Sequence, residues 1–207
     1  IDDKTAAVLV QQPNFLGNIE SMAVVAESAK AVKALSVASI YPVAMGLLQS
    51  PGKQGFDIVV GEGQSLGVPL GYGGPSFGFF ATSQKAVRKV PGRLVGISTD
   101  TEGRRAYTLT FQTREQHIRR EKATSNICTN NALIALRGCV HMAALGPKGL
   151  EEVACLSRQN MLELVDALEQ VGIYRAFPSQ AFFNEVTFRV ESTAVALRFK
   201  EMLRDRG

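Results

Sequence analysis

The chain has 207 residues, 45% of them hydrophobic, and its 23 basic and 19 acidic side chains give a net charge of +4. This supplies enough apolar material for a packed core, and so mild a charge without interleaved aromatics predicts no nucleic-acid partner. Three scattered cysteines and two histidines fit neither a disulfide framework nor a metal site, so reduced core thiols are expected. No apolar run reaches the roughly 18 residues of a membrane span and no signal peptide is evident, which predicts a cytoplasmic chain without a membrane partner.

Strand-like and helical patterns alternate in the first part of the chain. The elements expected there are strands at 5–10, 36–40 and 56–60, a helix at 19–35 with Asn18 as its N-cap, and a short helix at 44–49. This alternation predicts an α/β fold, with a parallel sheet covered by helices.

Helices dominate the later part of the chain. After a strand at 77–81, the expected elements are helices at 84–90, 127–145, 149–171 and 192–206, and a strand at 182–190. Gly146-Pro147 separates the two long helices, and Ser192 or Thr193 caps the last one. The segments 93–98 and 106–111 flank a turn, but their pattern leaves open whether they form a hairpin. We expect a large domain at 1–125, the linking helix and start of a smaller α/β domain at 126–207, and a chain that is a fragment of a longer protein.

The Gly-rich loop at 61–81 lies where pyridoxal phosphate (PLP) enzymes carry their cofactor lysine. An apolar run leads into the loop and a second one leaves it, as strand, loop and strand. A lysine amine there would form the Schiff base that makes PLP an electron sink. This sequence has Gln64 at that position, and an amide cannot form the linkage.

A second cofactor requirement is also missing. Such enzymes hold the pyridine nitrogen with an aspartate on a strand preceding the lysine loop. Between Glu27 and Asp57 this chain has no carboxylate, and Lys53 and Lys85 are poorly placed to replace the missing lysine. Two absences together favour a chain that does not itself bind PLP covalently.

Several longer motifs carry a family resemblance. They are Gln11–Phe15, Gly61–Gln64, Pro91–Gly96, Gln112–Arg120 and Ala123–Thr129. With these motifs, essentially the whole chain resembles the P-protein family of the glycine cleavage system, and within it the subunit 1 (α) form of decarboxylating glycine dehydrogenase. The resemblance implies a fold-type-I PLP-transferase-like domain, of which this chain is the later part, plus the start of the small C-terminal domain.

The resemblance also implies a function. In that family an α subunit pairs with a lysine-bearing β subunit in a heterotetramer. The complex decarboxylates glycine on PLP and transfers the aminomethyl group to the lipoyl arm of H-protein. By this resemblance PLP is bound by the partner subunit, and the present chain is inactive alone.

Two groups of residues are the candidate sites. Gly73 and Gly74 could contact the phosphate of the partner's PLP in trans through backbone N–H groups, or they could form an ordinary tight turn. The second group comprises Arg114, His117, Arg119, Arg120, Lys122, Thr124, Ser125 and Asn126. On a helix, its members at 114, 117 and 120 would share a face and could bind a substrate carboxylate, a phosphate or an acidic partner. A solvated basic helix paired with Glu115 and Glu121 is the alternative, with the last three residues as caps of the next helix.

Two other functions remain open. The chain could be a scaffold that binds a partner without touching its cofactor. It could also belong to an independent PLP enzyme whose lysine lies outside this sequence.

Overall fold

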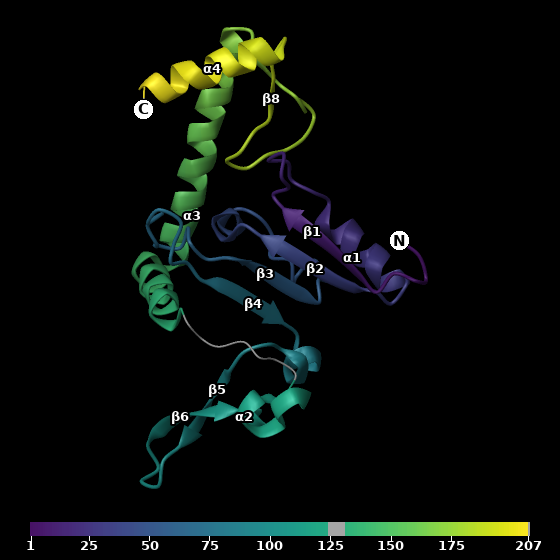
Figure 1. The fold of residues 1–207 in the computed structure, drawn as a ribbon, viewed down its shortest axis with the longest axis vertical. Helices are drawn as coiled ribbons and strands as arrows, with labels where there is room; N and C mark the ends of the chain where they lie inside the picture. The colour runs from purple at the N-terminus through teal and green to yellow at the C-terminus, as the bar shows by residue number, and fades with distance from the viewer. Residues whose placement is uncertain (124–130, 207) are drawn as a thin grey trace.

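The computed structural model describes residues 1–123 and 131–206. At its centre is a sheet with strand order β1-β2-β3-β4, formed by Ala7–Gln12, Leu35–Ile40, Ile58–Glu62 and Gly78–Thr82 (Figure 1). The first three strands are parallel, as predicted, whereas β4 runs antiparallel to β3. A loop rather than a helical crossover joins β3 to β4, and such a connection readily reverses the strand direction.

Helix α1, Met22–Ala31, packs its apolar stripe against the first two strands. Met22 and Ala26 form a buried cluster with Ala38 of β2 and with Phe56. The helix is shorter than predicted, and its N-cap is Ser21 rather than Asn18. Asn18 instead forms an isolated bridge with Phe182, which the local sequence pattern could not reveal.

Helix α3, Ala132–Gln170, is two helices joined at a kink, as Gly146-Pro147 predicts. Gly146 has φ 65° and ψ −179°, outside the helical region, and Pro147 follows it. The short 3-10 helix η1, Pro42–Gly46, packs against α3 at Ala154. Phe183 completes this second core cluster, which therefore joins three segments that are distant in the sequence.

The C-terminal region contains less strand than predicted. β7, Tyr174–Arg175, pairs only with β8, Phe188–Arg189, so the strand expected at 182–190 is mostly wrong. Phe182 and Phe183 are both buried, so this stretch does not alternate between an inner and an outer face. Helix α4, Thr193–Arg206, begins as predicted, and Ser192 Oγ accepts the Val195 N–H at 3.3 Å.

Arginine side chains surround the Phe182 ring. The guanidinium carbon of Arg158 lies 3.9 Å from the ring centroid and that of Arg175 lies 5.5 Å from it. Burial, and secondarily the charge of Arg175, lower the pKa of Arg158 from its ordinary value. Arg175 also pairs with Glu169 at 3.2 Å, so this stack attaches the 181–187 segment to α3.

Residues 83–123 form a separate lobe, the hairpin lobe, at one end of the molecule (Figure 1). It contains η2 (Gln84–Lys89), β5 (Leu94–Thr99), β6 (Arg105–Thr110), η3 (Gln112–Arg114), α2 (Gln116–Arg119) and η4 (Arg120–Lys122). The antiparallel pairing of β5 with β6 settles the question that the pattern left open.

Asp100 organises the hairpin turn. Its carboxylate accepts the backbone N–H groups of Glu102 and Arg104, both at 2.9 Å. Hydrogen bonds from the Arg104 backbone and then from its side chain lower the pKa of Asp100. The turn is therefore stabilised by the ionised carboxylate.

Cys139 and Cys155 are free thiols, but both are exposed, so the expectation of core thiols is wrong for these two. Cys128 lies outside the described residues. Among the described helices, none is both long enough and apolar enough to cross a membrane.

Candidate functional site

The loop between β3 and β4 is the one expected to lie at the cofactor-lysine position, and Gln64 is hydrogen-bonded within it. The Gln64 side-chain amide donates to the Val68 carbonyl at 2.6 Å, and the Gln64 N–H donates to Glu62 Oε1 at 3.0 Å. The Val68 N–H returns a bond to the Gln64 carbonyl at 3.0 Å. Gln64 therefore closes its own loop instead of presenting a reactive group.

The first half of α3 holds this loop in place. Phe77 fits between two glycines, since a Cβ built on Gly63 would lie 2.4 Å from the Phe77 ring and one on Gly138 would lie 2.5 Å from it. Arg137 Nε donates to the Gly67 carbonyl at 2.7 Å, and a Cβ on Gly67 would meet the His141 ring at 2.5 Å. His141 thus packs against the loop.

A glycine turn, residues 71–74, follows, in which residues 71–73 are exposed and Gly74 is half-buried. Gly71, Tyr72, Gly73 and Gly74 all have positive φ, from 52° to 146°. Tyr72 is fully exposed, and no heavy atom lies within 4 Å of a Cβ built on Gly73. The Gly73 N–H donates to the Leu70 carbonyl at 3.0 Å, so this donor is already used within the turn. Glycine suits the backbone here, and the turn can approach another molecule closely.

The residues present do not fit a PLP group held covalently by this chain. Gln64 cannot form the linkage, and β2, with the sequence LSVASI, has no carboxylate to hold a pyridine nitrogen. The nearby Asp57 lies just before β3, and its Oδ2 accepts the Ser36 N–H at 3.0 Å and the Ser36 hydroxyl at 2.9 Å. Asp57 therefore joins the amino ends of β2 and β3. Gln64 follows the carboxyl end of β3, so the two residues lie at opposite ends of that strand.

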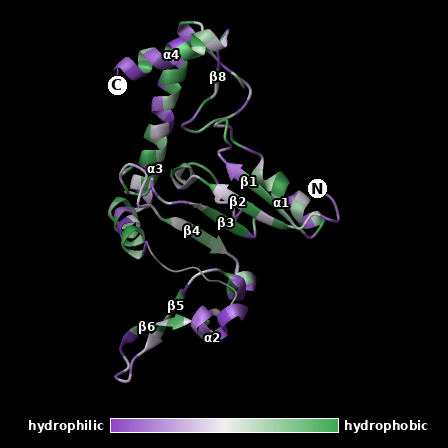
Figure 2. Cartoon of the chain, in the orientation of Figure 1, coloured by the Kyte–Doolittle hydropathy of each residue, from purple (hydrophilic) through white to green (hydrophobic). Residues whose placement is uncertain are grey.

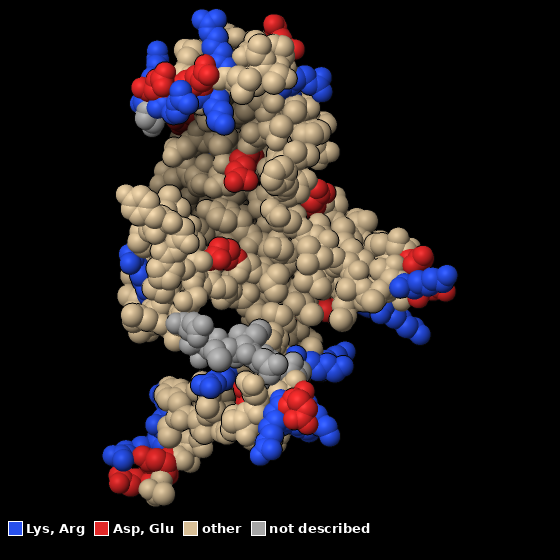
Figure 3. Space-filling view, in the orientation of Figure 1, with Lys and Arg blue, Asp and Glu red and all other residues tan. Residues whose placement is uncertain are grey.

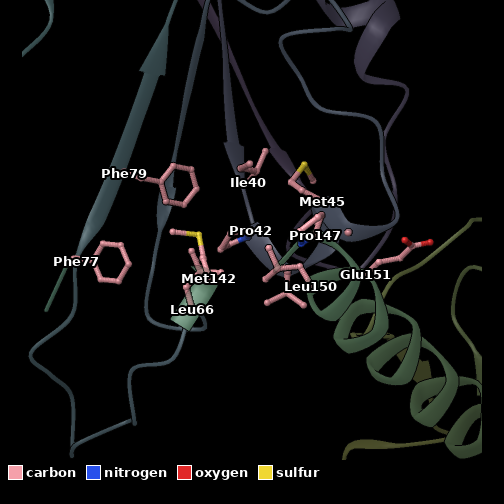
Figure 4. Close-up of a pocket in the computed structure, with 12 residues that line it drawn as sticks. Ile40, Pro42, Met45, Leu66, Phe77, Phe79, Met142, Pro147, Leu150 and Glu151 are labelled. Atoms are coloured by element: carbon pink, nitrogen blue, oxygen red, sulfur yellow. The ribbon is translucent and has the colours of Figure 1, made fainter. Parts of the chain in front are cut away.

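Sequence reasoning missed an apolar cavity of about 510 Å³ between the sheet and the kink of α3 (Figure 4). Side chains from β2, η1, β4 and both halves of α3 converge on it. They include Ile40, Met45, Leu66, Phe77, Phe79, Met142, Pro147 and Leu150, with Glu151 as the charged member of the lining. Such a lining suits an apolar group and offers little to an anion. No local pattern reveals the cavity, because its walls meet only in the folded chain.

The basic group does not form the single helix considered above. Glu115, with ψ 153°, separates η3 from α2, and Arg120 has φ 52° and ψ −123°. The shared helical face expected for positions 114, 117 and 120 is therefore wrong. His117 lines a small cavity of about 120 Å³ with Arg93 and Gln112.

The other basic side chains are distributed along this segment. Arg119 Nε donates to the Thr113 carbonyl at 3.0 Å, while Arg120 and Lys122 are exposed. The side chain of Arg114, together with Thr124, Ser125 and Asn126, lies outside the described residues. The structure thus gives an exposed basic segment rather than one converged site.

The central sheet and its helices have the PLP-transferase fold. An aspartate aminotransferase from Thermus thermophilus matches with a TM-score of 0.60 over 95% of this chain and 54% of that one. Its sequence identity is 17%, so this likeness shows the fold alone.

A family model described as glycine cleavage system P-protein matches residues 1–205, and the chain belongs to this family. A crystal structure of glycine decarboxylase (P-protein) of the glycine cleavage system, in inhibitor-bound form, matches with a TM-score of 0.91 and 48% identity. That match covers 99% of this chain and 47% of the other.

Curated relatives agree with this family. The proteins named probable glycine dehydrogenase (decarboxylating) subunit 1 from Geotalea daltonii and Azorhizobium caulinodans are 50% and 52% identical. The matches cover 91% and 94% of this chain but 43% and 44% of those proteins. The chain thus spans less than half the length of these relatives.

Proposed function

We propose that the chain is part of the lysine-less subunit of a glycine decarboxylase. In this proposal the second subunit holds PLP and decarboxylates glycine, and the aminomethyl product passes to lipoylated H-protein. The supporting observation is that Gln64, at the position where the sequence predicts the cofactor lysine, is bound into its loop by its own side-chain amide. This chain then supplies interface and positioning, and it is inactive alone.

Reconstitution tests this function. Each subunit is purified at its natural length and assayed, alone and mixed, for glycine-dependent exchange of carbon dioxide with lipoylated H-protein. We expect exchange only in the mixture, because neither subunit has a complete site. Exchange by the subunit that contains this chain, without its partner, would contradict the proposal.

We assign a trans contact to the glycine turn. In this arrangement Gly73 and Gly74 lie against the phosphate of PLP on the second subunit. The exposure of residues 71–73 and the positive φ angles at 71–74 favour close backbone approach. The Gly73 N–H already donates to the Leu70 carbonyl. Gly74 would therefore supply the amide donor, and the lack of a side chain at Gly73 would leave room for the phosphate.

Gly74→Val tests the contact. A branched side chain would block the approach, and we expect PLP affinity of the assembled complex to fall about tenfold, the effect of losing roughly one charge-assisted hydrogen bond. Cofactor titration of the complex measures this. Gly172→Val is the matched control, since Gly172 also has positive φ, 85°, and open space around its Cβ position. An unchanged PLP affinity of the Gly74→Val complex would contradict the proposed contact.

A scaffold without cofactor contact is the second candidate, favoured by the internal use of the Gly73 N–H. It predicts normal PLP affinity in Gly74→Val. For the basic group, a substrate carboxylate, a phosphate and an acidic partner surface remain the three alternative ligands. The group comprises Arg114, His117, Arg119, Arg120, Lys122, Thr124, Ser125 and Asn126.

A further inference from the structure

One face of the β5–β6 hairpin is apolar and exposed. Val95 pairs with Leu109 and Ile97 pairs with Tyr107, and directly paired residues share a face of the ribbon. The exposed fractions are 64% for Val95, 75% for Ile97, 65% for Tyr107 and 41% for Leu109. These four residues are called the hairpin face.

The opposite side of the ribbon differs. Leu94, Gly96 and Ala106 are partly buried, and Thr110 Oγ1 donates to the Leu94 carbonyl at 3.0 Å. The hairpin therefore leaves its more apolar side in solvent. A two-stranded ribbon is marginally stable in water, so covering the hairpin face would stabilise the lobe.

The charge of the lobe indicates what covers this face. Between Ser83 and Ala123 lie ten of the 23 Lys and Arg residues and four of the 19 Asp and Glu residues, a net charge of +6 in a chain whose total is +4. Figure 3 shows Lys and Arg side chains around the lobe, while the surface over the central sheet is mostly uncharged. Figure 2 shows hydrophobic positions on β5 beside a hydrophilic α2.

A second copy of the chain fits this surface poorly. A two-fold contact would place one lobe of charge +6 against another, and like charges at short range repel. A partner surface complementary to the hairpin lobe instead needs an apolar patch surrounded by acidic side chains.

We propose that the hairpin face docks onto such an acid-rimmed apolar surface of the second subunit. The inference rests on the proposed function, because that function supplies the second subunit. The four apolar side chains bury the centre of the contact. The basic residues at its edge, including Arg93 and Arg105, pair with the acidic rim and speed association.

Hydrogen exchange tests the docking without a mutation. The subunit at its natural length is compared alone and with the second subunit, and exchange of the amides in 94–110 is followed by mass spectrometry. Exchange is expected to slow by about tenfold or more in the mixture, as a marginal hairpin becomes fixed. Protection already present in the free subunit would overturn the inference, since the chain itself would then cover the face.

The double variant Ile97→Ser with Tyr107→Ser tests the energetics. The dissociation constant for the second subunit, measured by titration calorimetry, is expected to rise about tenfold or more, as for loss of a central apolar anchor. The control is Leu197→Ser with Leu203→Ser on α4, where the exposed fractions are 56% and 55%. Circular dichroism checks that both variants fold. Affinity equal to that of the wild type in the hairpin variant would overturn the inference.

The two proposals fail in different ways. A wild-type pair that exchanges carbon dioxide while 94–110 stays unprotected retains the function and overturns the docking face. A wild-type pair that neither associates nor exchanges overturns both.

Discussion

Replacing Phe183 by alanine is expected to destabilise the chain by about 3–5 kcal/mol, the usual cost of removing a buried aromatic ring from a core. Phe183 is 2% exposed and packs with Val43, Ala44 and Ala154. The Tyr41 ring lies 6.2 Å away between centroids, in a tilted arrangement. The ring therefore packs between η1, α3 and the C-terminal segment. Its loss leaves a cavity, because the three segments cannot move together to fill it.

Urea unfolding followed by circular dichroism measures this loss. Phe15→Ala is the matched control, because Phe15 is 90% exposed and its replacement should change stability by less than about 0.5 kcal/mol. Equal effects of the two substitutions would mean that Phe183 does not hold the C-terminal segment in place.

Gly17→Ala is expected to destabilise the same junction by about 2–5 kcal/mol, combining a left-handed backbone cost of about 1–2 with overpacking of about 1–3. Gly17 has φ 84°, and a Cβ there would lie 2.1 Å from the Glu185 carbonyl oxygen. Backbone atoms cannot rotate away as a flexible side chain would. The segment is also fixed by Ile19 N–H to Ala181 O at 2.8 Å and Thr187 Oγ1 to Leu16 O at 3.0 Å.

Thermal unfolding compares Gly17→Ala with Gly52→Ala. No heavy atom lies within 4 Å of a Cβ on Gly52, so this control should leave the midpoint nearly unchanged. A Gly17→Ala midpoint that matched the control would show that the 14–19 and 181–187 segments do not approach each other this closely.

Local sequence signals predicted much of the fold, because the elements that they specify are local. The central strands alternate with a helix, and Gly146-Pro147 interrupts α3 through backbone conformations intrinsic to those residues. The antiparallel direction of β4 and the shortness of β8 depend on which distant segments pair with each other. Local hydrophobic periodicity does not encode this pairing. The proposed division after residue 125 falls within 124–130, outside the described residues, and stays a prediction.

The candidate site was less predictable. The absence of lysine at Gln64 follows from residue identity, but the bond from its amide to Val68 depends on how the loop closes. The basic segment looked helical because its polar residues fit helical spacing, yet the extended ψ of Glu115 breaks it. The apolar hairpin face has strand periodicity in the sequence, but that pattern normally indicates a buried face. Its exposure appears only in the structure.

Locating PLP in the mixture of the two subunits tests directly whether this chain belongs to a subunit without the cofactor lysine. Borohydride reduces the Schiff base and fixes the cofactor to its lysine, and peptide mass spectrometry then identifies the chain that carries it. We expect the label on a lysine of the second subunit and none on this chain, whose Gln64 cannot react. A pyridoxyl group on Lys53, Lys85 or any other lysine of this chain would contradict this expectation.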